Sequence, residues 1–212
     1  KTGVFGLYDL IGIDLMADVL KSFIKELSEQ DPFQIVAKEI PLVKNLIETG
    51  YTGRKGKGGF YRINKTGETK VMEAINLENG EYLPSKKINI KSDKVYLKSL
   101  ISREDKFGEY AWSVISKIIK YASSLVPSIT KDFNDIDEAM RLGFNWTKGP
   151  FEMLEEIGVE NFFNKIDNFK GNVFLENLHK SKNQDFYGSR QKYTKIETLG
   201  KVKKKAITVD GN

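Results

Sequence analysis

A segment of twelve residues near the start of the chain recurs near residue 150. Residues 3–14 align without gaps on residues 149–160, and four of the twelve positions are identical, namely a glycine, a phenylalanine, an isoleucine and a second glycine. The pattern predicts a tight entry at the first glycine, a two-turn helix that buries phenylalanine and isoleucine, and a chain reversal at the second glycine. The repeat therefore predicts two related helical units.

Apolar residues recur at helical spacing elsewhere in the chain, and turn residues bound these segments. The periodicity predicts helices over residues 15–27, 41–50, 112–125, 134–143 and 150–158. Asp14 and Asn134 are the predicted N-caps of two of these helices, and Asp137 is predicted to favour the positive end of its own helix. Short strand-like runs at residues 60–63, 70–72 and 88–90 predict a small hairpin.

The change of character near residues 84–100 marks the expected boundary between units. We predict a mainly α protein with two tandem helical units and a small β-hairpin between them. The first unit covers residues 1–90 and ends in the β element, the second covers residues 91–194, and residues 195–212 form a basic linker or tail. The chain opens at Lys1 without an initiator methionine and close to a helix start, which predicts a fragment with a truncated first unit.

Composition excludes several kinds of site. The chain has no cysteine, a single histidine (His179) and a formal net charge of +5. Thiolate metal sites and cysteine nucleophiles are therefore excluded, and one histidine cannot build a histidine-based metal site. No apolar run reaches the roughly 18 residues that a membrane span needs. We expect a cytoplasmic protein with no membrane partner, in which His179 is a solvated helix residue.

A glycine-rich segment, GRKGKGG at residues 53–59, invites comparison with phosphate-binding loops. A Walker loop would need lysine and then serine or threonine after Gly58, where Gly59 and Phe60 stand. A dinucleotide fingerprint would need a strand before the glycines and a helix after them, and here the strand-like run follows. The segment therefore predicts a glycine-rich turn into a strand.

Two other sets of charged residues favour structural roles. Glu155 and Glu156 are adjacent on a predicted helix, so they point about 100° apart and cannot both face one substrate. Asp135 and Asp137 are explained by capping. Lysines at residues 195–205 would suit a nucleic acid, but no recognised motif accompanies them and the charge excess is small, so no nucleic-acid partner is expected.

Three segments carry a family resemblance. Residues 135–144 (DIDEAMRLGF) and 149–154 (GPFEML) resemble the C-terminal domain of 3-hydroxyacyl-CoA dehydrogenases, where the pattern is roughly I-D-x-A-M-x-x-G, a short gap, then G-P-F-E-L-L-D-x-x-G. Residues 53–61 (GRKGKGGFY) resemble the G-R-K-x-G-x-G-F-Y motif that closes the first such domain. With the repeat, the resemblance covers most of residues 1–190.

The resemblance implies a fold and an activity. It points to the long, multifunctional members, in which a Rossmann domain precedes two tandem C-terminal domains of the 6-phosphogluconate dehydrogenase C-terminal-domain-like type, and an enoyl-CoA hydratase domain follows in some. The NAD site and the catalytic histidine with its glutamate lie in the Rossmann domain. The resemblance thus implies the substrate-enclosing and assembly region of an NAD-dependent (S)-3-hydroxyacyl-CoA dehydrogenase of β-oxidation, which converts 3-hydroxyacyl-CoA to 3-oxoacyl-CoA as a homo-oligomer.

Site residues follow from the same resemblance. No catalytic, cofactor-binding or metal-binding residue is expected on this chain, and the chain alone is expected to be inactive. Residues expected at a substrate cleft or domain interface are Phe5, Leu7, Ile11, Arg54, Lys55, Lys57, Phe60 and Tyr61. Either Phe5, Leu7 and Ile11 or a set in the second unit lines such a surface, and the alternative is that these residues only fill the core. The set in the second unit is Phe151, Met153, Leu154 and Ile157.

The second unit departs from the family pattern. It has no Asn-Arg pair around residues 112–125, and its closing motif is reduced to DFYG at residues 185–188. This predicts a structural copy without an active site of its own. The alternative function is a non-enzymatic helical interaction or dimerisation module that shares the fold.

Overall fold

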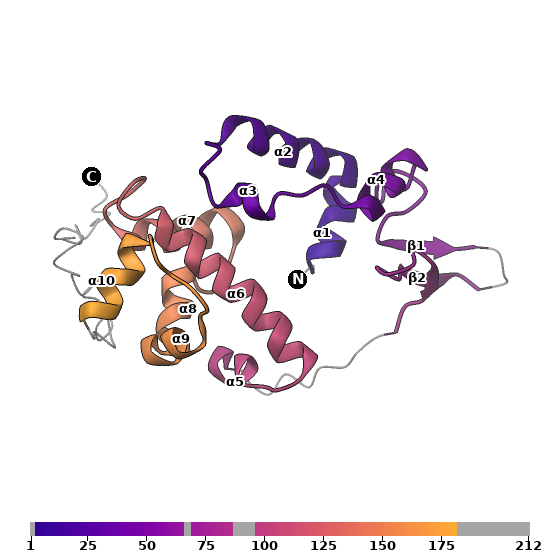
Figure 1. Ribbon diagram of the computed structural model, residues 1–212. Coiled ribbons are helices and arrows are strands. Elements are labelled where there is room, and N and C mark those ends of the chain that lie inside the picture. Colours follow the sequence, from indigo (N-terminus) through magenta and orange to yellow (C-terminus); the bar gives the residue numbers. More distant parts are fainter. Residues whose placement is uncertain (1–2, 66–68, 87–95, 182–212) are drawn as a thin grey trace, which may run out of the picture. The chain divides into compact units, whose positions relative to one another are not determined.

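The chain forms two compact units, residues 1–91 and residues 92–212. The computed structural model describes residues 3–65, 69–86 and 96–181 of the 212 (Figure 1). The predicted strand at residues 88–90, the degenerate motif at residues 185–188 and the basic tail at residues 195–212 lie outside the described residues. Helices predominate, which confirms the predicted mainly α class.

The first unit opens with helices that pack on a small core and ends in a sheet. The core consists of Ile13, Leu46 and Phe60, with Tyr8 and Leu42 among the half-buried residues against it. The helices are α1 (Val4–Ile11), α2 (Ile13–Glu26), α3 (Phe33–Val36) and α4 (Pro41–Glu48). Pro41 begins α4, where its missing N–H removes no helical hydrogen bond.

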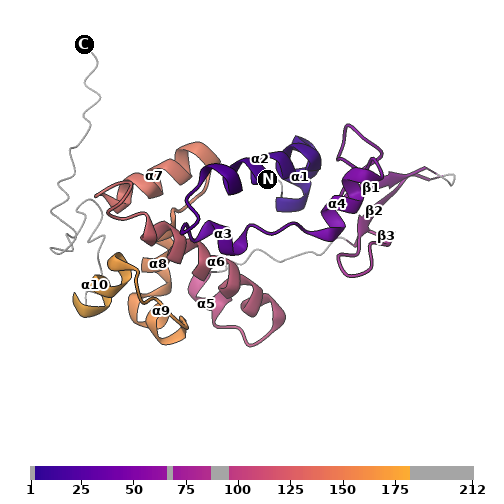
Figure 2. The ribbon, with the colours of Figure 1, turned by 45° about the horizontal axis from the view of Figure 1, so that its top comes forward.

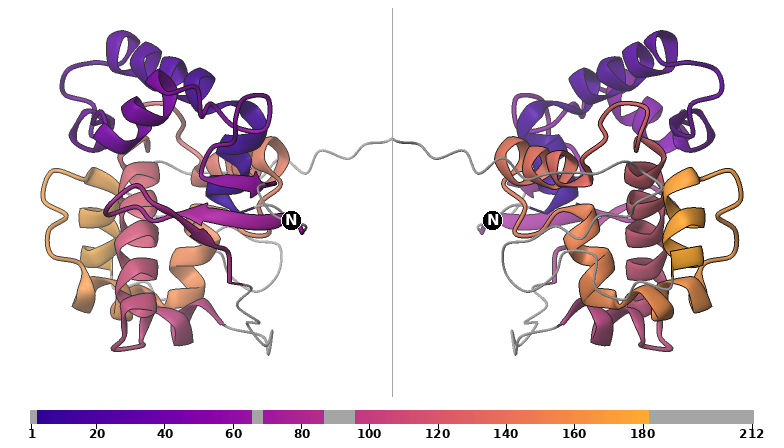
Figure 3. Two further views of the ribbon diagram at one scale, coloured as in Figure 1. Left: turned by 90° about the vertical axis from the view of Figure 1, so that its right-hand side faces the viewer. Right: turned by 90° about the vertical axis from the view of Figure 1, so that its left-hand side faces the viewer.

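The β element is larger than the predicted hairpin and lies within the first unit. Strands β1 (Tyr61–Asn64), β2 (Val71–Ile75) and β3 (Tyr82–Pro84) form an antiparallel sheet in the order β1-β2-β3. Figure 3 shows β1 and β2 side by side, and Ile63 is paired with Met72 in their register. The turn at Gly80, whose φ is +75°, leads into β3, which is too short to leave a periodic signal in the sequence.

The second unit is a bundle built around one long helix. Helix α6 (Lys106–Ser124) packs against α5, α8 and α10 (Figure 2). Its core is rich in aromatic rings and includes Phe151, Phe162 and Phe174, none of which is exposed. The other helices are α5 (Leu97–Ile101), α7 (Phe133–Phe144), α8 (Pro150–Ile157), α9 (Val159–Lys165) and α10 (Val173–Ser181).

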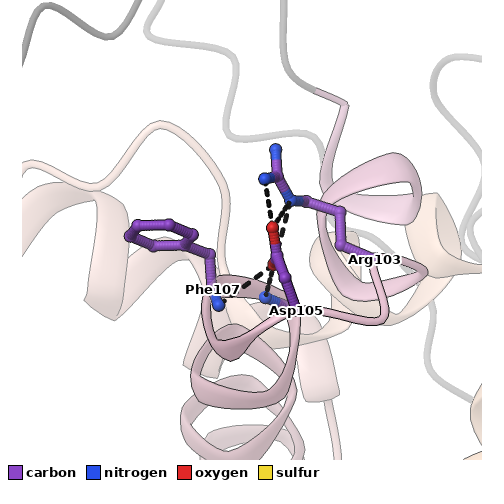
Figure 4. A network of polar contacts seen from close by, with 4 residues as sticks. Arg103, Asp105 and Phe107 are labelled. Carbon is purple, nitrogen blue, oxygen red and sulfur yellow. Dashed lines mark hydrogen bonds and ion pairs between the residues drawn. The ribbon is translucent and has the colours of Figure 1, made fainter.

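Helix α6 begins several residues before the predicted start because a local cap fixes its first turn. The carboxylate of Asp105 accepts from the backbone N–H groups of Phe107 and Gly108, both at 3.1 Å. The Arg103 guanidinium donates hydrogen bonds to the same carboxylate (Figure 4). These bonds hold the pKa of Asp105 at about 2, chiefly through Arg103 and then through the Gly108 N–H.

Three predicted capping roles were wrong. Gly12 stands at the start of α2, so Asp14 lies inside its first turn and makes no capping hydrogen bond. Asp132, rather than Asn134, caps α7 by accepting from the Asn134 N–H at 2.9 Å. Asp137 lies beyond the first turn of α7 and its carboxylate reaches the start of α8 instead.

The predicted repeat is visible in the backbone. Gly12 and Gly158 adopt φ values of +119° and +90° with ψ of 124° and 128°, a region that favours glycine. Each glycine N–H donates to the carbonyl four residues earlier, and each glycine carbonyl accepts from the next helix. The pairs α1–α2 and α8–α9 are therefore the same helix–glycine–helix element used twice.

Candidate functional site

The glycine-rich turn at residues 53–59 folds against the C-terminal half of α1. Gly53 and Gly58 pair as an antiparallel bridge, with the Gly53 N–H donating to the Gly58 carbonyl at 2.7 Å. The Arg54 N–H donates to the carbonyl of Asp9 at 2.8 Å. Both glycines have φ above +110°, so side chains are disfavoured there. The turn therefore positions the start of β1 beside α1.

Asp9 joins the turn and the strand to the helix. Asp9 is 3% exposed, and its carboxylate accepts from the N–H groups of Phe60 and Tyr61, each at 2.8 Å. A Cβ atom on Gly59 would collide with that carboxylate, which explains the glycine at position 59. These two hydrogen bonds offset the free-energy cost of burying the carboxylate. Sequence reasoning missed Asp9, although it is the only charged residue in the apolar helix α1.

A polar cluster stabilises the sheet behind this turn. The Nε of Arg62 lies 2.7 Å from Oε2 of Glu73, and the Asn64 side-chain amide donates to Oε1 at 2.9 Å. The guanidinium also lies 3.9 Å from the centre of the Tyr82 ring. Asn64 and then Arg62 hold the pKa of Glu73 below its usual value, whereas burial raises the pKa of Tyr82 to about 12.

A cleft of about 910 Å³ lies between the first turn of α1, the glycine-rich turn and the edge of the sheet. Its wall includes Phe5, Arg54, Lys57 and Tyr61, four of the eight residues that sequence analysis singled out. Phe60 is buried behind Phe5, at 4.7 Å between ring centres. The other three do not line the cleft and are exposed: Leu7, Ile11 and Lys55.

The cleft has an excess of positive charge. Asp9 and Arg62 also line the cleft. Backbone N–H groups compensate the charge of Asp9, and Glu73 compensates the charge of Arg62. Lys57 donates to the Thr49 carbonyl at 3.1 Å and forms no ion pair with an acid among the described residues. Arg54 and Lys65 form no ion pair with any residue that the structure describes. This charge favours an acidic or otherwise anionic group at the cleft.

Comparison with known proteins identifies the family. The model of the "3-hydroxyacyl-CoA dehydrogenase, C-terminal domain" family matches residues 1–63 and 110–206, one stretch in each compact unit. The chain belongs to this family. The resemblance found in the sequence motifs is thereby confirmed, and the glycine-rich turn and Asp9 both lie within the first matched stretch.

Curated relatives of this dehydrogenase family are much longer. A putative fatty acid oxidation complex trifunctional enzyme of Rickettsia prowazekii is 39% identical over 166 residues, which are 78% of this chain and 23% of that protein. Its Rickettsia felis namesake is 38% identical over 154 residues (73% and 21%). A probable 3-hydroxyacyl-CoA dehydrogenase of Bacillus subtilis is 28% identical over 198 residues (88% and 24%). The chain spans about a quarter of these relatives or less. No solved structure matches it.

The second family unit uses its polar residues to join helices. Glu156 accepts from the Leu97 N–H at 2.8 Å and from Lys148 at 2.6 Å, and these bonds outweigh burial and lower its pKa. Phe151, Leu154 and Ile157 are fully buried, so these three fill the core, and Met153 is half-buried against it. His179 is exposed on α10, with its ring 4.8 Å from that of Phe163. The described residues contain no group of three or more acids or histidines able to hold a metal.

Among the described residues, no helix is long and apolar enough to cross a membrane.

The glycine-rich turn does not fit a dinucleotide phosphate. Five of its backbone N–H groups, those of Gly53, Arg54, Gly56, Lys57 and Gly59, donate to carbonyl groups of the protein itself. They are therefore not available to a pyrophosphate, which needs free N–H groups at a helix start. The turn leads into β1 rather than a helix.

Proposed function

We propose that the chain is the helical C-terminal region of an NAD-dependent (S)-3-hydroxyacyl-CoA dehydrogenase of fatty-acid oxidation. The observation that carries the proposal is the family match in both units. In this proposal, residues 1–90 are a first unit, residues 91–194 a second unit, and residues 195–212 a linker or tail. The two units close the acyl-CoA cleft and form the assembly contacts of a cytoplasmic homo-oligomer.

The chemistry itself is assigned to a domain other than these two units. Oxidation of a 3-hydroxyacyl-CoA needs a base at the 3-hydroxyl and a nicotinamide that accepts the hydride from C3. His179 does not suit the role of base, because its ring packs on Phe163 and Phe169 and no carboxylate of the described residues orients it. The internally bonded glycine-rich turn does not suit NAD. The proposal therefore requires a Rossmann domain as partner, and it allows a hydratase domain.

The proposed contribution of the first unit is its cleft. Phe5 and Tyr61 offer aromatic surface, and Arg54 and Lys57 offer positive charge. This combination supports contact with the remainder of the dehydrogenase or with its anionic substrate. Three residues outside the cleft wall are proposed as contacts at the domain interface: Leu7, Ile11 and Lys55. Buried Phe60 packs against the ring of Phe5 and supports it.

A measurement of dehydrogenase turnover tests the proposal. The chain alone should not oxidise NADH in the presence of acetoacetyl-CoA, and the longer polypeptide that includes a Rossmann domain should. His179→Ala in that polypeptide should leave turnover unchanged, since His179 is not the proposed base. Turnover by the chain alone that disappears in His179→Ala would overturn the assignment of the chemistry to another domain. A longer polypeptide without dehydrogenase activity would favour the interaction-module alternative.

A further inference from the structure

Asn79 and Gly80 lie in the turn that connects β2 to β3 (Figure 2). Asn79 is exposed, and Gly80 adopts a φ of +75°. Asparagine and glycine are frequent in turns because both tolerate such backbone conformations. The turn lies between the two stretches that the family model matches, so the family motifs do not account for it. The pair therefore allows chemistry that is separate from those motifs.

The sequence Asn79–Gly80 permits a reaction within the main chain. The Gly80 nitrogen attacks Cγ of Asn79, so that an N–Cγ bond forms and the Cγ–Nδ2 bond breaks. Hydroxide removes the proton of the Gly80 N–H, and the amide group takes a proton from water and leaves as ammonia. The product is a cyclic succinimide, and nothing is oxidised or reduced. Glycine favours the attack because it has no Cβ atom to shield its nitrogen.

The turn holds the Asn79 side chain in a way that supports the attack. Oδ1 of Asn79 accepts from the Glu81 N–H at 3.0 Å. This donor polarises the amide carbonyl and stabilises the negative charge that develops on Oδ1 when a nitrogen attacks Cγ. Nδ2 of Asn79 donates to Oε2 of Glu81, also at 3.0 Å. Both polar atoms of the amide are therefore held close to the main chain that follows.

One hydrogen bond opposes the reaction. The Gly80 N–H donates to the carbonyl of Asn76 at 2.8 Å, so the attacking nitrogen is occupied while the turn is closed. The attack requires this bond to break. An exposed turn opens locally at a much smaller free-energy cost than global unfolding. The reaction is therefore expected in the folded chain, at a rate that depends on opening of the turn.

Two other asparagines share the side-chain geometry but not the glycine. Oδ1 of Asn76 and Oδ1 of Asn168 each accept, at 2.9 Å, from the N–H group two residues later. The residues that follow them directly are Leu77 and Phe169, whose side chains crowd the main-chain nitrogen. These two asparagines are therefore matched controls within the same chain.

Water opens the succinimide in two ways. Cleavage between Cγ and the Gly80 nitrogen gives an aspartate at position 79. Cleavage at the main-chain carbonyl gives an isoaspartate, in which the main chain runs through Cβ and Cγ and is longer by one methylene group. In both products a carboxylate replaces the amide that donates to Glu81, so two negative charges repel each other in the turn.

The isoaspartate would disturb the start of β3. The turn is closed by the Gly80 N–H on the Asn76 carbonyl and by the Asn76 N–H on the Glu81 carbonyl, the latter at 2.7 Å. A methylene group added between residues 79 and 80 displaces both partners of Asn76. β3 begins at Tyr82, whose hydroxyl donates to the Gly59 carbonyl. The modified turn would therefore weaken a link between the sheet and the glycine-rich turn.

We propose that Asn79 is a site of spontaneous deamidation in the folded chain, through a succinimide with Gly80, and that the isoaspartate product loosens β3 from β2. Water is the only co-reactant. The proposal goes beyond the dehydrogenase function and does not depend on it, because the tests measure covalent composition and amide exchange rather than turnover.

Incubation of the unaltered full chain at neutral and at mildly basic pH tests the chemistry, with mass analysis of its peptides. Asn79 should lose its amide at least about tenfold faster than Asn76 and Asn168, which corresponds to a barrier lower by about 1.4 kcal/mol. The rate should rise with pH, because hydroxide removes the Gly80 proton, and both aspartate and isoaspartate should form. Equal rates at the three asparagines would overturn the proposal. Aspartate without isoaspartate would show direct hydrolysis and would overturn it as well.

Amide exchange tests the effect on β3. The Asn76 and Ser85 amides bond across the β2–β3 pair, and in the purified isoaspartate form they should exchange at least about tenfold faster than in the fresh chain. Asn79→Asp, which supplies the carboxylate on a normal main chain, should have a smaller effect. Asn79→Gln should stay unmodified on incubation, because its imide would need a larger ring. Unchanged exchange in the isoaspartate form, or an equal effect of Asn79→Asp, would overturn the loosening by a lengthened main chain.

Discussion

Asp137 lies so close to Gly149 that a Cβ atom on the glycine would collide with the carboxylate. The contact joins the middle of α7 to the first turn of α8, where the same carboxylate accepts two backbone hydrogen bonds. A helix start that is buried needs such acceptors, because the first-turn N–H groups have no helical partner. Glycine at this position is therefore a packing requirement rather than a conformational one.

Gly149→Ala should destabilise the second unit by about 2–4 kcal/mol, because the new methyl group displaces the Asp137 carboxylate from its two donors. Trp112 and Trp146, the only tryptophans in the chain, both belong to the second unit, so urea unfolding followed by tryptophan fluorescence reports this unit alone. Gly143→Ala is the matched control. Gly143 lies in helix α7 with nothing within 4 Å of a Cβ, so alanine should stabilise by about 0.5–1 kcal/mol.

Asp9→Asn should destabilise the first unit by about 1–3 kcal/mol. An amide keeps only one oxygen, so one of the two donors, Phe60 or Tyr61, then faces an NH₂ group in a buried site. The expected readout is faster amide exchange in β1 and in the glycine-rich turn, with the second unit unchanged. Asp18→Asn, on the exposed face of α2, is the control and should stay within about 0.5 kcal/mol. Equal effects of the two substitutions would contradict the anchoring role of Asp9.

The sequence predicted elements whose signals are local. The repeat of residues 3–14 at residues 149–160 corresponds to one backbone element in both units, because Gly12 and Gly158 can adopt positive φ and end their helices. The starts of α4 and α8 were predicted from Pro41 and Pro150 for a similar local reason. Family motifs then identified the class of protein.

The sequence did not predict roles that depend on distant contacts. Asp9 and Asp137 both looked like ordinary helix residues, and their acceptor roles appear only when chain segments 51 and 14 residues away fold onto them. Strand β3 was missed because three residues carry no periodicity. Of the residues that the sequence singled out, Arg54 and Lys57 line the cleft, whereas Leu7 and Ile11 do not.

Asp105 should make the second unit sensitive to acid. Its pKa of about 2 in the folded protein lies below the unfolded value of about 3.9. A lowered folded pKa means that the contribution to stability is complete above the unfolded pKa and is lost as the pH falls from about 4 through about 2. The urea midpoint of the tryptophan signal should therefore fall over this window.

Asp105→Asn is the appropriate comparison for the acid effect, because asparagine is also a good N-cap but does not titrate. The variant should unfold at a lower urea concentration than the unaltered chain at pH 6 and should lose less stability between pH 4 and pH 2. Arg103→Gln, which removes the cation that clasps Asp105, should shift the acid transition upward in pH. Identical pH profiles for all three proteins would refute the role of this cap.

Arg62→Lys should destabilise the first unit although it preserves the charge. Arg62 donates a directed hydrogen bond to Glu73, and its guanidinium lies 3.9 Å from the centre of the Tyr82 ring. A lysine ammonium reproduces neither contact in the same geometry. The expected fall in melting temperature of the first unit is about 2–4 °C, measured by the temperature dependence of amide exchange in β2. Arg54→Lys is the control, since Arg54 has no acid partner among the described residues and its charge is retained. An unchanged melting temperature in Arg62→Lys would show that the charge alone stabilises the sheet, and an equally large fall in Arg54→Lys would show that the effect does not come from the contacts of Arg62 with Glu73 and Tyr82.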